Sequence, residues 1–114
     1  MDGGLEVYLE QSGEVPIVRV LGEIDLATAP QLRDQLAELP PDCGTVIVDL
    51  SEVTFLDSTG LSVLVANWKR FSNGEEKGDL RLVVNRPAIQ RVLEVTGLAQ
   101  VFGVFSSLEE AIQG

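Results

Sequence analysis

A run of β-branched residues near the middle of the chain constrains the fold more than any other feature. Thr45-Val46-Ile47-Val48 is continuously β-branched and is followed by Asp49-Leu50. A strand with one wet face alternates apolar and polar residues, whereas a strand covered on both faces does not. The run therefore predicts a covered strand in the middle of a sheet.

Two short strands are expected before this run. Leu5, Val7 and Leu9 alternate with polar residues, which is typical of a strand with one exposed face. The turn Ser12-Gly13-Glu14 then leads into a second apolar segment over 15–21. The pair predicts a β-hairpin.

Helical periodicity appears on both sides of the central strand. Thr28, with Gln31 three residues later, predicts a capping box for a first helix that Pro40-Pro41 ends. A second amphipathic helix is expected from Ser58 to Asn73-Gly74. Its apolar stripe consists of Leu61, Leu64, Val65, Trp68 and Phe71.

The remaining segments continue the alternation of strands and helices. A strand over 80–84, a helix opened by Pro87, a strand over 101–105 and a last helix capped by Ser107 follow in turn. The order ββαβαβαβα implies right-handed crossovers and a mixed, mostly parallel sheet. With 114 residues, 45% of them hydrophobic, we expect a single α/β domain over 1–114.

The composition excludes several chemistries. The chain has no histidine and one cysteine, Cys43, so Ser-His-Asp catalysis, a His/Cys zinc site and an internal disulfide are impossible. We expect no metal and no cofactor. The net charge of -10 makes nucleic acid and anionic membranes poor partners. No apolar stretch approaches a bilayer span and the amino-terminal residues do not resemble a secretory signal, so a cytoplasmic location is expected.

The segment Phe55–Leu61 is the most informative for function. It joins the central strand to the second helix, and such loops lie at the carboxyl edge of a parallel sheet, where ligands and partners bind. Ser58 is expected as the N-cap of the helix, with Gly60 leaving the site open from outside. Capping alone, worth about 1 kcal/mol, would explain the serine.

A second interpretation makes Ser58 an exposed hydroxyl that a kinase modifies. A phosphate adds about -1.5 to -2 charges at a helix N-terminus, which favours it, beside Asp57, which opposes it. The fold should therefore survive modification. Like charges across a docked interface can cost several kcal/mol, so binding should change much more than stability.

The chain resembles the STAS-domain anti-sigma factor antagonists in several stretches. Val46–Ser51 and Val53–Leu61 are similar to the signature of that family. Gly22–Asp25 with Thr28-Ala29-Pro30 is similar to its second strand end and first helix. Matches downstream, at Arg91–Leu98 and Phe105–Ala111, cover the third helix and the last corner.

The resemblance implies a single-domain STAS fold and a partner-switching regulator that catalyses nothing. Its partners would be an anti-sigma factor with serine kinase activity and a metal-dependent serine phosphatase. Ser58 would be the phosphoacceptor, Asp57, Thr59 and Gly60 would shape the loop, and Asp25 would border the docking surface. The chain is expected as a monomer or weak dimer.

Other interpretations remain open at this point. A stand-alone STAS subunit of an ABC-type transporter would have the same fold. A hydrolase using Ser58 lacks a general base, because the chain has no histidine. Asp49 is expected to bind loop amides, and Trp68 is expected to lie in the core. Cys43 is expected to be unreactive because it has no basic neighbour in the sequence.

Overall fold

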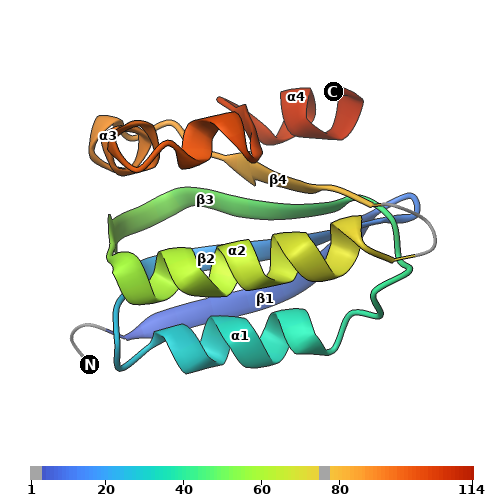
Figure 1. Ribbon diagram of the computed structural model, residues 1–114, viewed down its shortest axis with the longest axis horizontal. Helices are drawn as coiled ribbons and strands as arrows, with labels where there is room; N and C mark the ends of the chain where they lie inside the picture. Colours follow the sequence, from blue (N-terminus) through green and yellow to red (C-terminus); the bar gives the residue numbers. More distant parts are fainter. Residues whose placement is uncertain (1–3, 75–77) are drawn as a thin grey trace.

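A five-stranded mixed sheet forms the centre of the molecule, with helices on both faces (Figure 1). The computed structural model describes residues 4–74 and 78–114. The strands lie in the order β1-β2-β3-β4-β5; only the β1-β2 pair is antiparallel. Their bounds are β1 Leu5–Ser12, β2 Val15–Ile24, β3 Val46–Leu56, β4 Leu80–Val83 and β5 Gly103–Phe105.

In the part of the chain that the structure describes, four α-helices and one 3-10 turn connect and cover the strands. They are α1 Ala29–Ala37, α2 Ser58–Ser72, α3 Pro87–Val95, the 3-10 turn η1 Leu98–Gln100 and α4 Leu108–Gln113. The predicted order ββαβαβαβα is confirmed, with η1 as an addition before a shorter final strand. Among the described residues, no helix is long and apolar enough to cross a bilayer.

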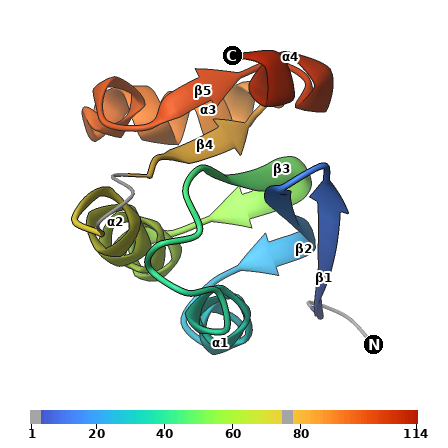
Figure 2. The same cartoon turned by 90° about the vertical axis from the view of Figure 1, so that its right-hand side faces the viewer.

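β3 is the middle strand, as its continuous apolar run predicts. Val46, Val48 and Leu50 are fully buried in the larger core, beneath the helices on one face. Ile47 points to the opposite face, where it packs with Ala111 of α4 in a smaller cluster. Figure 2 shows α4 on the side of the sheet opposite α1 and α2. Each fully buried side chain of this size contributes about 1.5–3 kcal/mol to stability.

Arg70 ties α1 to α2. Its guanidinium donates to the carbonyl oxygens of Leu39 at 2.8 Å and Leu36 at 2.6 Å, at the end of α1. It also donates to the amide oxygen of buried Asn67. The Leu36 carbonyl also accepts from the amide of Leu39 at 3.1 Å, so Arg70 adds a charged donor there and supplies a donor to the Leu39 carbonyl just beyond the helix.

Two sequence expectations need correction or lie outside the described residues. β3 continues through Leu56, so Phe55 and Leu56 belong to the strand and not to a loop. Pairing with β2 carries the strand this far, because Ile24 and Leu56 are still partners. The polar composition of Glu75–Asp79 predicts a solvated loop, but most of this segment lies outside the described residues.

Candidate functional site

The carboxyl ends of β2 and β3 lie side by side, and each is followed at once by a turn into a helix. Ile24 pairs with Leu56, and the amide of Asp57 donates to the carbonyl of Ile24 at 3.2 Å. Asp25 and Asp57 therefore occupy equivalent places on neighbouring strands. The parallel sheet brings together two of the residues that the sequence resemblance singled out.

Asp57, not Ser58, is the N-cap of α2. Its backbone is extended, and its Oδ1 accepts from the amides of Thr59 at 2.9 Å and Gly60 at 3.1 Å. The expectation that Ser58 caps the helix is wrong by one residue, because β3 runs on to Leu56 and leaves Asp57 alone at the corner. Thr59 and Gly60 consequently lie in the first turn of α2 and not in a loop.

Ser58 is the first helical residue and is exposed. Its carbonyl accepts from the hydroxyl of Ser62 at 2.9 Å. Within residues 4–74 and 78–114, the Ser58 hydroxyl makes no hydrogen bond. Since Asp57 has taken over the capping, the Ser58 hydroxyl is left available to a reagent or enzyme from outside.

Gly60 faces the interior. A Cβ at this position would lie 2.6 Å from Ile24 Cγ2 and 2.6 Å from Leu56 Cδ1, both far closer than van der Waals contact. The expectation that Gly60 opens the site to an approach from outside is therefore wrong. The glycine instead lets the start of α2 pack directly on the ends of β2 and β3, which fixes where Ser58 emerges.

Asp25 organises the turn before α1. Its Oδ1 accepts from the amides of Ala27 and Thr28, each at 3.0 Å. The hydroxyl of buried Thr28 donates back to the carbonyl of Glu23 at 2.7 Å and accepts from the amide of Asp25 at 2.9 Å. The predicted capping box at Thr28 is wrong, because this turn engages the hydroxyl and Thr28 makes no side-chain cap. Gln31 donates to the carbonyl of Leu5 instead.

Two exposed apolar side chains lie at this edge, and the sequence analysis assigned neither of them as a contact residue. Leu26, directly after Asp25, is 76% exposed, and Phe55, near the end of β3, is 47% exposed. Large apolar side chains held in water beside polar ones are typical of protein interaction sites. The sequence signals for them were weak: Leu26 is an apolar residue inside a turn, and Phe55 is an apolar residue at an outward position of a strand.

A groove begins at Ser58 and runs along α2 beside η1. It has a volume of about 480 Å³. Its floor is apolar, formed by Leu61, Val65, Ala66 and Leu98, while Ser58, Ser62 and Lys69 supply its polar atoms.

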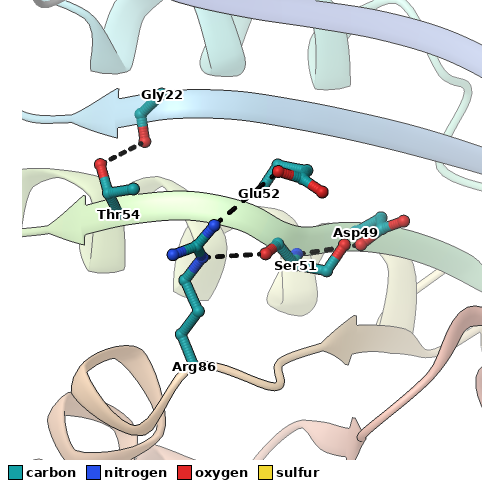
Figure 3. A network of polar contacts seen from close by, with 6 residues as sticks. All are labelled: Gly22, Asp49, Ser51, Glu52, Thr54 and Arg86. Carbon is teal, nitrogen blue, oxygen red and sulfur yellow. Dashed lines mark hydrogen bonds and ion pairs between the residues drawn. The ribbon is translucent and has the colours of Figure 1, made fainter.

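A polar network supports the last part of β3, which carries the site (Figure 3). Arg86, before α3, donates to the carbonyl of Ser51 at 3.1 Å and lies 3.8 Å from the carboxylate of Glu52. Asp49 accepts from the amide of Ser51 at 3.0 Å, where the pairing with β2 shifts register. Asp49 therefore binds a backbone amide as expected, although that amide lies within the strand.

The remaining candidates lie away from this edge. Trp68 packs against the larger core, as its helical stripe predicts. Partial burial raises the pKa of the Cys43 thiol, although Arg70 acts in the opposite direction. Burial dominates, so little of the reactive thiolate is present near neutral pH. Among the described residues, no three His, Cys, Asp or Glu side chains gather to hold a metal ion.

Comparisons of the sequence and of the structure with known proteins lead to the same family. The family model of the STAS domain matches residues 6–111. The chain is 34% identical to the anti-sigma-F factor antagonist RsfB of Mycobacterium tuberculosis, over 96% of this chain and 88% of that protein. It is 31% identical to the anti-sigma-B factor antagonist of Bacillus subtilis, over 96% and 98% respectively. The crystal structure of an anti-sigma factor antagonist from Mycobacterium paratuberculosis superimposes with a TM-score of 0.85 at 34% identity, covering 97% of this chain and 93% of that one.

Proposed function

Because the chain belongs to the STAS domain family, we propose that it is an anti-sigma factor antagonist controlled at Ser58. While Ser58 is unmodified, the protein binds an anti-sigma factor with serine kinase activity and so releases a sigma factor. Phosphorylation of Ser58 by that kinase ends the complex, and a serine phosphatase restores it. Relatives that are 34% and 31% identical carry the names of such antagonists.

One observation carries the proposal: the exposed hydroxyl of Ser58 at the start of α2 is released from capping by Asp57. A serine that capped its own helix would exchange its hydroxyl bond to the first-turn amides for bonds from the phosphate, so modification would remodel the helix start. Here the amides of Thr59 and Gly60 stay bound to Asp57 whether or not Ser58 carries a phosphate. Modification therefore leaves the fold intact.

The same geometry limits how far the helix start can compensate the phosphate charge. Two of its first-turn amides, those of Thr59 and Gly60, are already occupied by the Asp57 carboxylate. Lys69, the cation in the adjoining groove, lies eleven residues after Ser58 on α2. At the rise of an α-helix this separation is about 16 Å. The phosphate would add about -1.5 to -2 charges to an edge that already bears Asp25 and Asp57.

The partner is expected to dock over this edge. Leu26 and Phe55 supply the apolar surface for it, and the carboxylates of Asp25 and Asp57 lie beside them. A partner that fits these groups presents an apolar pocket next to basic or amide donors. Two new negative charges in such a contact cost several kcal/mol, and each 1.4 kcal/mol weakens binding tenfold.

The test uses purified cognate anti-sigma kinase and three forms of the protein. Isothermal titration should give similar dissociation constants for wild type and Ser58→Ala, within about threefold, and a constant for Ser58→Glu at least about tenfold weaker. Incubation with kinase and ATP should place one phosphate on Ser58, located by mass spectrometry, and none on Ser58→Ala. A phosphate on Thr59 or Ser62, or equal binding of Ser58→Glu, would overturn the proposal.

A cellular capture separates this function from the transporter alternative. Wild type and Ser58→Glu are used as baits in extract of the source cell. The proposed switch requires a small ATP-binding kinase that wild type retains and Ser58→Glu loses. If both baits retain the same transporter ATPase, Ser58 is not a switch and the antagonist proposal fails.

A further inference from the structure

One face of α2 stays exposed from the first turn of the helix to the last. Its exposed residues follow one another at spacings of four, four and three, which places them on the same side of the helix: Ser58, Ser62, Ala66 and Lys69. The groove beside η1 runs along this face. An apolar floor therefore leads from the Ser58 hydroxyl to the Lys69 ammonium.

The ammonium of Lys69 has no partner in the described part of the chain, where it makes neither a hydrogen bond nor an ion pair. In the same residues, four arginines lie 3.3–3.8 Å from carboxylates: Arg19, Arg33, Arg81 and Arg86. A position in the last turn of α2 suits the helix dipole and explains the positive charge of Lys69. The ammonium nevertheless stays free to bind a carboxylate from outside.

Given the antagonist function proposed above, on which this inference rests, we propose that the groove receives an apolar segment of the anti-sigma kinase and that a carboxylate of this segment pairs with Lys69. The groove opens at Ser58, so a kinase whose active site reaches the Ser58 hydroxyl already covers the near end of the groove. Apolar side chains of the segment cover Leu61 and Leu98, as in the core of a protein interface.

Charge fixes how the segment lies in the groove. Of the described residues that line it, Lys69 alone is charged. The chain as a whole carries a net charge of -10, so a carboxylate of the partner is repelled by most of the surface and attracted at Lys69. Complementary charges of this kind set the register of a complex and discriminate against other partners.

The two ends of the groove act independently. Ser58 and Lys69 are about 16 Å apart along α2, whereas the Debye length at physiological ionic strength is about 8 Å. A phosphate on Ser58 is therefore screened from the ion pair at Lys69. Effects of changes at sites this far apart add in free energy, so their effects on the dissociation constant multiply. The groove determines which kinase binds, and Ser58 determines when that kinase is released.

Isothermal titration with the purified cognate anti-sigma kinase tests the pair. Lys69→Glu should weaken binding at least about tenfold, by the same factor in the wild-type and Ser58→Glu backgrounds. The control Arg91→Glu makes the same change of charge at an exposed arginine of α3, which likewise has no ion pair among the described residues and lies outside the groove. Its dissociation constant should stay within about threefold of wild type.

The outcomes separate this inference from the proposed function. If Ser58→Glu weakens binding and Lys69→Glu does not, the groove proposal fails and the switch at Ser58 stands. If neither variant weakens binding, both fail. If Arg91→Glu weakens binding as much as Lys69→Glu, only net charge matters and the groove proposal is overturned. Circular dichroism should show all variants folded, because the three side chains are exposed.

Carbodiimide cross-linking of the complex identifies the partner group directly. The reagent joins an ammonium group to a carboxylate in contact with it as an amide, with loss of water. We expect a link between Lys69 and an aspartate or glutamate of the kinase, located by mass spectrometry of proteolytic peptides. Lys69→Arg keeps the charge, so it should bind within about threefold of wild type and lose this link. A link through the other lysine, Lys77, alone or no link at all would overturn the proposal.

Discussion

Replacing Asp57 by alanine should destabilise the protein, whereas replacing Ser58 by alanine should not. Asp57 Oδ1 holds two first-turn amides of α2, at 2.9 and 3.1 Å, and no other described side chain caps that helix end. Loss of an N-cap costs about 0.5–2 kcal/mol. The Asp57 carboxylate also interacts with the helix dipole, which is worth about 0.3–1 kcal/mol. We therefore expect Asp57→Ala to lower the free energy of unfolding by about 1–2 kcal/mol.

Two further variants separate the hydrogen bonds from the charge. Asp57→Asn keeps a good N-cap and loses only the charge, so the cost should be about 0.5 kcal/mol. Ser58→Ala removes a hydroxyl that bonds to nothing described, and the change should stay within about 0.5 kcal/mol. Urea unfolding followed through Trp68, the only tryptophan and a residue of α2, reports all three.

The midpoints should follow the order wild type ≈ Ser58→Ala > Asp57→Asn > Asp57→Ala, with unchanged m-values. In thermal unfolding, Asp57→Ala should melt about 5–10 °C below wild type. The reasoning fails if Ser58→Ala is as destabilised as Asp57→Ala, because Ser58 would then be the cap.

Three other predictions follow from the packing. Arg70→Ala removes two donors from the end of α1 and should lower the free energy of unfolding by about 2–3 kcal/mol in urea. The control Arg33→Ala removes an exposed ion pair and should cost under about 1 kcal/mol. Equal costs would contradict the bridging role of Arg70. Gly60→Ala should lose up to about 2 kcal/mol net, because crowding costs about 1–3 kcal/mol and the gain in helix propensity is about 1 kcal/mol. A stabilised variant would show that α2 can shift. Since burial raises the pKa of the Cys43 thiol, the thiol should react more slowly with a disulfide reagent at pH 8 in the native protein than in urea. The native thiol should gain reactivity as the pH rises through its raised pKa, and equal rates at pH 8 would show an unshifted thiol.

The sequence by itself determined the order of the elements, the central place of β3 and most of the core. These features depend on the periodicity of apolar side chains, which is local: a continuous apolar run forms a covered strand, and a stripe such as that of Leu61, Leu64 and Phe71 forms a helix against it. The site's location was also within reach, because a strand-to-helix connection in a parallel sheet ends at the carboxyl edge.

Only the tertiary structure decided what each residue at that edge does. Whether Asp57 or Ser58 caps α2 depends on how far β3 continues, which its pairing with β2 sets through Ile24 and Leu56. The inward direction of Gly60 depends on the angle at which the helix packs on the sheet. Leu26 and Asp57 are far apart in sequence and share one edge only because β2 and β3 are parallel neighbours. Local patterns specify which elements form, and non-local contacts specify where those elements begin and which side chains meet.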